Sequence, residues 1–354
     1  MNIDKKTSGT LMIANLAATI LVIAIHYNTK SSAEGLNYLV QEYLTNGIAR
    51  IAVPFFALMS GFFMAKTILK KPYTEIIYNK SKTLLIPYLL GSSTVLLAYL
   101  AKEYFYHANS SLNISFQWLI KAIFIRPESE QFWFLRDLII LTIATPILIN
   151  INRNMYVLMA IVVGSMWSID YQPFPVIAGW YFLNIETLFF FILGGLLFKN
   201  KALLNWTVNS NRKLTIFIFC LWLASLAIRV YLDPQLNVWY AKEYTLTSIL
   251  LYKFAILIGI LSLIQISASI YSNQKLVYLS GLTFFAYLYH LAPLSFFRIV
   301  TSPLIREGYG FYINFPIALI AVFFVAHCTS KIQPNLFAFI TGGRNPNKAL
   351  KRTQ

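Results

Sequence analysis

The sequence predicts an all-α, polytopic membrane protein, and three observations point to this fold class. Apolar residues make up 58% of the chain and charged residues only 12%, whereas a soluble domain is about one quarter charged. About ten apolar stretches are long enough to cross the roughly 30 Å of hydrocarbon in a bilayer. They leave too little polar sequence for the two soluble domains that 354 residues would otherwise accommodate.

Each apolar stretch is expected to form one transmembrane helix, because a helix satisfies its own backbone hydrogen bonds inside lipid. The first stretch follows Lys5 and Lys6, as the apolar part of a signal peptide would, but no convincing small-residue cleavage site follows it. The fifth is short. The expected spans are 9–27, 48–68, 83–101, 132–150, 155–169, 180–198, 214–231, 247–269, 276–294 and 311–330.

The longest outer loop is expected over 102–131. Within it, residues 116–125 are amphipathic and are predicted to lie at the membrane interface. We expect residues 1–334 to form one membrane domain and residues 335–354 to form a short basic cytoplasmic tail. No soluble catalytic domain is evident, so any chemistry is expected in the membrane domain.

Lysine and arginine residues predict the orientation of the chain. Most of them fall in the connections on the same side as the N-terminus, and cytoplasmic loops carry such an excess. Both termini are therefore expected in the cytoplasm. The net charge of +16 then reflects topology, and we expect no nucleic-acid partner.

Six titratable residues within or at the ends of the spans are the candidate functional residues. With this orientation, all of them lie in the outer half of their spans, and an ionisable side chain inside lipid marks a functional site by default. We expect them to line a polar cavity that opens to the outside. Simpler interpretations remain open: a residue at a span end can snorkel to the interface, and adjacent charges can form a structural pair. The six residues are His26, Arg136, Asp137, Glu186, Lys253 and His290.

The chemistry open to these residues is proton transfer and anion binding. The chain lacks a phosphate-binding glycine loop, a CxxC pair, an HExxH motif and a GxSxG motif. Cys220 and Cys328 have no metal-ligand spacing and are expected to be apolar fillers, and no metal is expected. A histidine near neutrality suits proton abstraction from a hydroxyl, and a cation can stabilise an oxyanion. Acyl transfer and proton-coupled transport both fit these residues.

Five local strings, in their order, resemble the acyltransferase 3 family of bacterial membrane O-acyltransferases. The resemblance extends over roughly residues 10 to 330. The strings run from Asn15 to His26, from Arg50 to Phe63 (RIAVPFFALMSGFF), from Lys82 to Tyr88 (KTLLIPY), from Phe132 to Leu138 (FWFLRDL), and from Phe285 to His290 (FAYLYH).

The resemblance implies an inner-membrane enzyme. It would take an acyl group, most simply acetyl from acetyl-CoA, and transfer it to a hydroxyl of a surface-glycan precursor such as lipopolysaccharide O-antigen. It implies His26 as general base, with Arg136 and Glu186 as further catalytic residues. It implies an acceptor site with Arg50, Ser60, Trp133, Asp137, Tyr287 and His290, and donor binding by Asn15, Lys66, Lys82 and Tyr88. No permanently bound cofactor is implied.

One departure from the family pattern concerns the donor. The family has an arginine eleven positions before the histidine, but here that position holds Asn15. This spacing is about three helical turns, which places both side chains on one helix face about 16 Å apart. Asn15 carries no charge, so another cation is expected to bind the donor, and Lys66 and Lys82 are the candidates nearest the membrane.

Two other classes of function remain open. A transporter or flippase for a glycan precursor or small anionic solute would suit the same residues, although no repeated halves are evident. An inactive, structural member of a polysaccharide-synthesis complex is suggested by Asn15.

Overall fold

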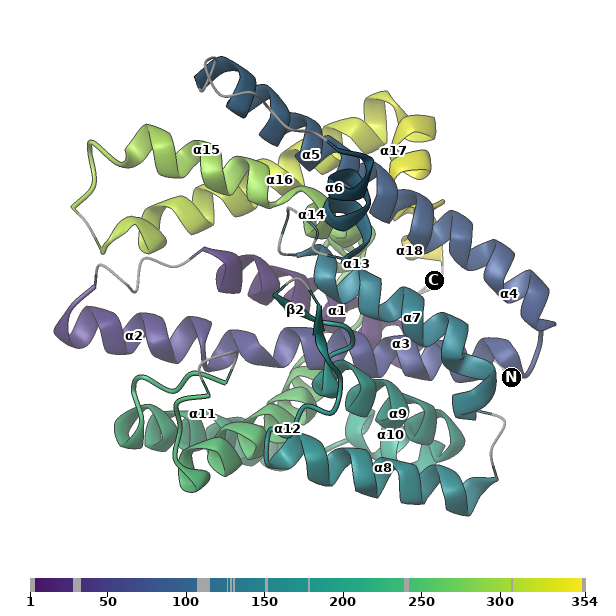
Figure 1. The fold of residues 1–354 in the computed structure, drawn as a ribbon. Helices are drawn as coiled ribbons and strands as arrows, with labels where there is room; N and C mark the ends of the chain where they lie inside the picture. Colours follow the sequence, from purple (N-terminus) through teal and green to yellow (C-terminus); the bar gives the residue numbers. More distant parts are fainter. Residues whose placement is uncertain are drawn as a thin grey trace.

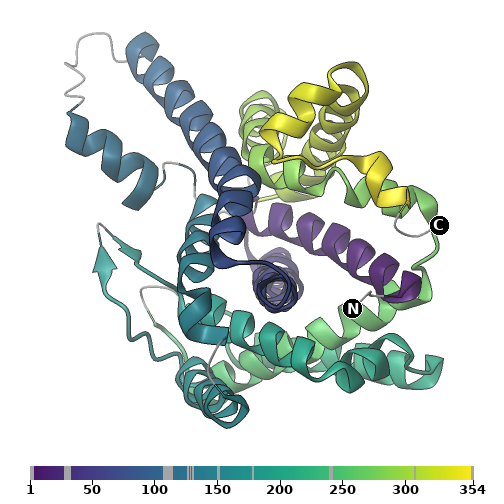
Figure 2. The same cartoon turned by 90° about the vertical axis from the view of Figure 1, so that its right-hand side faces the viewer.

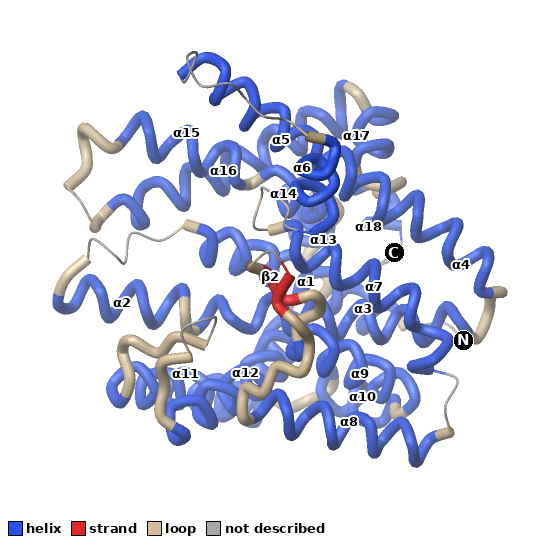
Figure 3. The backbone as a smooth tube through the Cα atoms, viewed as in Figure 1, coloured by secondary structure: helices blue, strands red, loops and turns tan. Residues whose placement is uncertain are grey.

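The computed structural model describes residues 4–27, 33–106, 115–125, 127, 129, 131–149, 152–177, 179–238, 242–306 and 308–351. These residues are almost entirely helical, as Figure 3 shows, apart from loops and one short antiparallel hairpin of β1 (Val176–Ile177) and β2 (Trp180–Tyr181). The all-α fold class is confirmed. The helices are α1 (Lys5–His26), α2 (Gly35–Thr45), η2 (Ile48–Ile51), α3 (Ala52–Ile68), α4 (Tyr73–Lys80), η3 (Ser81–Leu85), α5 (Ile86–Tyr106), α6 (Phe116–Ile120), η4 (Lys121–Ile125), α7 (Phe132–Ile149), α8 (Arg153–Ser168), α9 (Ile185–Lys199), α10 (Lys201–Val208), α11 (Arg212–Leu232), α12 (Leu246–Ser269), α13 (Gln274–Ser280), α14 (Thr283–Tyr289), α15 (Leu291–Thr301), α16 (Gly310–Ile332), α17 (Pro334–Ile340) and α18 (Pro346–Lys351).

The described helices are those of a multi-pass membrane protein. Six of them are long and apolar enough to cross a membrane, and there are up to seven if the bent pair Ile185–Lys199 and Ala202–Val208 counts as one span. The second predicted span is part of a longer, nearly continuous run, Gly35–Ile68, in which η2 joins α2 to α3. The fourth, fifth and sixth predicted spans are the shorter helices α7, α8 and α9.

The centre of the bundle holds α1, α3, α9 and α12, and Figure 2 shows the first helices (purple) between the teal middle of the chain and its green and yellow C-terminal part. The contact between α3 and α9 depends on glycine. A Cβ atom on Gly194 would lie 2.0 Å from the Leu58 carbonyl oxygen, and one on Gly61 would lie 1.9 Å from the Phe191 carbonyl oxygen. Small residues therefore bring the two backbones together, as is common between membrane helices.

The ninth predicted span, 276–294, is not one helix. It is divided among α13, α14 and α15, with breaks at Gly281 and at His290. Pro293 explains the second break, because it has no N–H to bond the Tyr289 carbonyl in a continuing helix. A Cβ atom on Gly281 would lie 2.4 Å from Pro346 Cα, so the first break lies where α18 approaches the bundle.

The segment predicted as a basic tail folds back onto the helices. Helix α17 packs against α16 and α5, and α18 packs against α13, with Phe337 and Ala349 buried. The last three residues, which include Arg352, lie outside the described residues. Both termini lie at the right-hand end of the bundle in Figure 1, whereas α2 and the connection between α15 and α16 lie at the left-hand end.

A buried ion pair joins α2 to α11. Arg229 Nη1 lies 2.5 Å from Glu42 Oε1, and both side chains are completely buried. Arg229 also donates a hydrogen bond to the Asn46 carbonyl oxygen at 2.8 Å, and the Asn46 amide donates to Glu42 at 2.8 Å. Each charge is thus both paired and hydrogen-bonded, which buried charges require.

Candidate functional site

Two histidines from distant parts of the chain meet in the bundle. His26 ends α1, His290 follows α14, and their ring centroids are 5.2 Å apart with the planes tilted by 46°. His290 lies where the ninth predicted span breaks, so the same break that ends α14 positions this side chain.

The hydrogen bonds of His290 determine which ring nitrogen is basic. Its Nδ1 lies 2.9 Å from the Tyr287 carbonyl oxygen and 3.2 Å from that of Ala286. A carbonyl only accepts, so Nδ1 carries the proton in the neutral ring and Nε2 holds the lone pair. Nε2 is buried and has no hydrogen-bond partner among the described residues. His290 therefore presents an unused basic nitrogen in the pair.

A second group of charges lies around Glu186 and Lys253. Glu186 Oε2 accepts a hydrogen bond from Trp167 Nε1 at 2.9 Å and lies 3.9 Å from Lys253 Nζ. Lys253 Nζ is 3.1 Å from Asp170 Oδ1, so it lies between two carboxylates. Asp170, Glu186 and Lys253 line a small polar cavity of about 40 Å³ together with Arg50. The simpler interpretation of Lys253 as a snorkelling lysine does not fit this ion-paired position.

Arg136 and Asp137 form a third group, in which they fasten α7 to the loop before α9. Arg136 donates to the carbonyl oxygens of Ile125, at 2.6 Å, and Tyr181, and it lies 3.3 Å from Asp137. Asp137 is fully buried and accepts a hydrogen bond from the Asn184 backbone N–H at 3.0 Å. Neither residue lines any of the three cavities described in this section.

The prediction that all six titratable residues line one cavity is therefore wrong. Among the described residues they form three separate groups: the histidine pair, the Glu186–Lys253 pair and the Arg136–Asp137 pair. The physical reason is that sequence gives the depth of a residue along a span but not the direction in which its side chain points around the helix axis.

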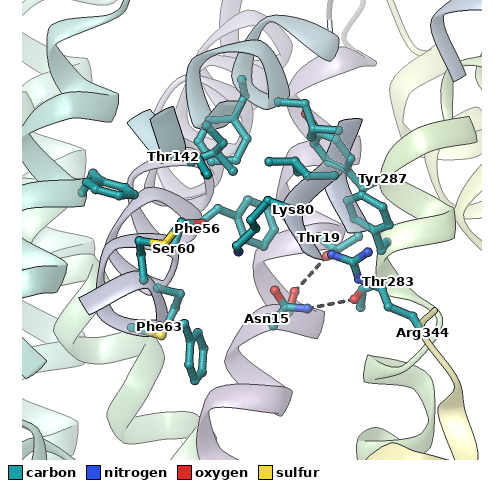
Figure 4. A pocket seen from close by; sticks show the side chains of 18 residues that line it. Asn15, Thr19, Phe56, Ser60, Phe63, Lys80, Thr142, Thr283, Tyr287 and Arg344 are labelled. Carbon is teal, nitrogen blue, oxygen red and sulfur yellow. Dashed lines mark hydrogen bonds between the residues drawn. The ribbon is translucent and has the colours of Figure 1, made fainter. Parts of the chain in front are cut away.

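A cavity lies beside Tyr287 and the middle of α1, and we call it the inner cavity. It has a volume of about 280 Å³ and is lined mostly by apolar side chains. Figure 4 shows Asn15, whose amide donates to the Thr283 hydroxyl at 2.8 Å, together with Ser60, Lys80 and Arg344. Tyr287 also lines this cavity, and its ring centroid is 6.4 Å from that of His290. The cavity thus extends from Asn15 toward the histidine pair.

A wider basic cavity, which we call the mouth, adjoins the inner cavity. The mouth has a volume of about 880 Å³ and shares Asn15, Thr283 and Arg344 with the inner cavity. Neither cavity is lined by an aspartate or a glutamate among the described residues, so their charge is entirely positive. The cations that line one or both of them are Lys66, Lys70, Lys71, Lys80, Arg344 and Lys348.

The structure distinguishes the residues predicted to bind the donor. Asn15 and Lys66 line the mouth. Lys82 lines neither cavity, because its amine donates to the Tyr78 hydroxyl at 2.6 Å. Tyr88 is buried, donates to the Ile123 carbonyl oxygen and packs against Phe132. The expectation that Lys82 and Tyr88 contact the donor is therefore not met by their positions.

Of the predicted acceptor residues, Ser60 and Tyr287 line the inner cavity, while Arg50 lines the small polar one. Trp133 packs against the apolar core next to Phe134. Lys80 belongs to the group of cytoplasmic lysines that the sequence also offers as candidates to attract the CoA phosphates, and it lines the inner cavity. Sequence reasoning missed Asp170 and Arg344 as site residues. Asp170 follows the fifth apolar stretch and is one of only 13 acidic residues, a signal that would have identified it. Arg344 lies in the segment predicted as a tail, and no local pattern connects it to the bundle.

No group of three or more histidine, cysteine, aspartate or glutamate side chains among the described residues is placed to hold a metal ion. A family model described as an acyltransferase domain matches residues 16–330. No curated protein matches the chain, and no solved structure matches it. The matched range contains both histidines of the pair but ends before Arg344.

Proposed function

The chain belongs to the acyltransferase 3 family, because the match covers well over half of its length, and from this premise we propose a transfer of acyl groups across the membrane. The donor is an acyl-CoA, most simply acetyl-CoA, that enters from the cytoplasm. The acceptor is a hydroxyl of a surface-glycan precursor, such as lipopolysaccharide O-antigen, on the other face of the inner membrane.

The observation that carries this proposal is the order of the two cavities, which reach Tyr287 beside the histidine pair. A wide basic mouth adjoins a smaller, mostly apolar cavity, and the ring of Tyr287, which lines that smaller cavity, has its centroid 6.4 Å from that of His290. This order suits an acyl-CoA, whose phosphates favour cations and whose thin pantetheine arm suits an apolar channel. The thioester would then approach the histidines through the mouth, at the end of the bundle where both termini lie.

His26 acts as the general base in this proposal. It removes the proton from the acceptor hydroxyl as the oxygen attacks the thioester carbonyl carbon, and the C–S bond then breaks. The thiolate of CoA receives the proton from the imidazolium. His290 lies beside His26 and contributes a second basic nitrogen, while its hydrogen bonds to backbone carbonyls fix its ring.

The acceptor site is proposed on the side of Arg50, which lines the small polar cavity with Glu186 and Lys253. Arg50 and Glu186 are suited to bind sugar hydroxyls, because charged groups form the stronger hydrogen bonds. Arg136 and Asp137 then act indirectly, by holding the loop that begins α9. Ten spans with both termini in the cytoplasm remain part of this proposal.

The test is acyl transfer by the purified protein in proteoliposomes. With radiolabelled acetyl-CoA and a lipid-linked glycan acceptor, we expect label in the glycan fraction. Omission of the acceptor should leave the label on CoA. Absence of transfer with every glycan acceptor tried, in protein that binds CoA, would contradict the proposal.

A transporter or flippase is the second candidate, and the broken helices favour it. The divided segment α13–α15 and the 95° bend between α9 and α10 resemble the discontinuous helices that form binding sites in transporters. Movement of a lipid-linked glycan across the bilayer without any acyl donor would support this function over acyl transfer.

A further inference from the structure

Arg344 is half-buried where the mouth meets the inner cavity, and it lines both. Its Nη1 donates to the carbonyl oxygens of Thr83, at 3.1 Å, and Thr341, at 2.5 Å. Its guanidinium lies over the Phe284 ring, 3.5 Å from the ring centroid. Figure 4 shows this group beside Thr283, the hydroxyl to which Asn15 donates.

The chain is shaped to bring Arg344 to this place. Gly342 and Gly343 both have positive φ, 67° and 83°, which turns the backbone sharply after α17. A Cβ atom on Gly342 would lie 2.6 Å from Thr83 Cα, so only glycine allows this close approach. Pro87 lacks the N–H that an α-helix would use to bond the Thr83 carbonyl, which leaves this oxygen accessible to Arg344.

The charge of Arg344 has no acidic partner in the cavities. The carbonyl oxygens that it contacts are neutral, and no carboxylate lines either cavity among the described residues. Lys80 lines the inner cavity as well, and the two positive charges repel one another. Burial lowers the pKa of Arg344 to about 10, so its guanidinium remains charged at neutral pH. Two partly desolvated cations that repel each other are stabilised when an anion binds between them.

We propose that Arg344 and Lys80 form a phosphate-binding subsite that holds the phosphorylated part of the donor at the junction of the two cavities. Arg344 thereby supplies, from the C-terminal segment, the positive charge that Asn15 lacks. The identification of that phosphorylated ligand as CoA rests on the proposed function, whereas the subsite itself rests on the two cations and the cavities.

Binding measurements on the purified full-length protein in nanodiscs test this subsite. Three probes are compared by calorimetry: CoA, inorganic pyrophosphate, and pantetheine, which has no phosphate. We expect Arg344→Gln and Lys80→Gln each to weaken binding of CoA and pyrophosphate about tenfold or more, with pantetheine unaffected. Arg344→Lys keeps the positive charge and should therefore lose less affinity for CoA and pyrophosphate than Arg344→Gln does. Lys213→Gln, an exposed residue at the start of α11 outside both cavities, is the matched control.

The outcomes separate the subsite from the proposed function. Unchanged affinity for CoA and pyrophosphate in both glutamine variants overturns the subsite, even if acetyl transfer is intact. Equal loss for pantetheine overturns it too, because that result indicates a structural role for the cations. If Arg344→Gln fails to fold, the affinities of Lys80→Gln and Arg344→Lys for the same three probes decide whether the subsite exists. Pyrophosphate binding that depends on Arg344, without any acyl transfer, upholds the subsite and contradicts the proposed function.

Discussion

At the scale of single residues, the hydrogen bonds of a side chain decide its chemistry more than its type does. His26 and His290 are both histidines of one pair, yet the backbone carbonyls of Ala286 and Tyr287 fix the proton of the fully buried His290 on Nδ1. Arg136 and Arg344 are both arginines in the bundle. Among the described residues, Arg136 is paired with Asp137, whereas Arg344 contacts carbonyl oxygens and an aromatic ring and has no carboxylate beside it in the cavities. Of these two arginines, Arg344 is therefore the one that is available to an anionic ligand.

His26→Ala should abolish acyl transfer without loss of folded protein. Loss of a general base costs about 10² to 10⁴ in rate. The measurement is the initial rate of radiolabelled acetyl transfer by purified protein. His327→Ala is the matched control, because His327 is exposed and its ring hydrogen-bonds to the Tyr278 hydroxyl, outside the histidine pair. Near-wild-type transfer by His26→Ala would rule out His26 as the base.

Asn15→Arg should restore donor binding to Arg344→Gln but should not tighten it in the wild-type protein. Both positions line the same two cavities, so either can supply one cation there. In the single variant Asn15→Arg, the new charge adjoins Arg344 and Lys80, and we expect a lower melting temperature in the absence of CoA because like charges repel. Calorimetric titration with CoA compares the single and double variants. If the double variant binds CoA as weakly as Arg344→Gln alone, a cation at position 15 cannot replace the one at position 344.

At the scale of elements, breaks and close contacts between helices position the site. His290 follows the break between α14 and α15, and Arg344 follows the turn between α17 and α18. The long helices around them are fixed by glycine contacts, such as Gly61 and Gly194 between α3 and α9, and by the buried pair of Arg229 and Glu42. The candidate functional residues His290 and Arg344 therefore lie at breaks between helices, and the packed helices around them hold these breaks in place.

Arg229→Leu should destabilise the contact of α2 with α11, because Glu42 would then remain buried without its partner. Removal of one member of a buried ion pair costs about 3–5 kcal/mol, whereas replacement of both can be nearly neutral. The double variant Arg229→Leu with Glu42→Leu should therefore melt closer to the wild type than the single variant does. Thermal unfolding in detergent measures this. Equal melting temperatures for the single variant and the wild type would show that the pair does not stabilise the fold.

At the scale of the whole molecule, the described cavities differ in the charges that line them: the mouth is lined by cations without carboxylates, whereas the small polar cavity has both cations and carboxylates. The basic mouth and both termini lie at the end formed by the start of α1 and the end of α3, and the acyl donor is proposed to enter there. The small polar cavity, with its carboxylates Asp170 and Glu186, is lined by Arg50 just before α3, by the start of α9 and by the first half of α12. An orientation with the mouth in the cytoplasm places these acidic groups toward the outside.

Cysteine labelling tests this orientation. In a background in which Cys220 and Cys328 are replaced by alanine, Ser302→Cys, between α15 and α16, should react with a membrane-impermeant maleimide on intact cells. Ser272→Cys, between α12 and α13, should react only after permeabilisation. Both serines are exposed. The reverse pattern would place the termini outside and would remove the proposed route for the donor.

The sequence by itself determined the all-α membrane fold, the positions of the apolar segments and the resemblance to the family that matches residues 16–330. These properties are local, since a run of apolar residues must form its own hydrogen bonds inside lipid wherever it lies in the bundle. Only the tertiary structure decided which polar residues meet. It separated Arg136 from Glu186, paired His26 with His290 and brought Arg344 from an apparent tail to the cavity of Asn15. Rotation of a helix about its axis, and the path of a segment after the last span, depend on contacts between distant residues, which a pattern of apolar runs does not encode.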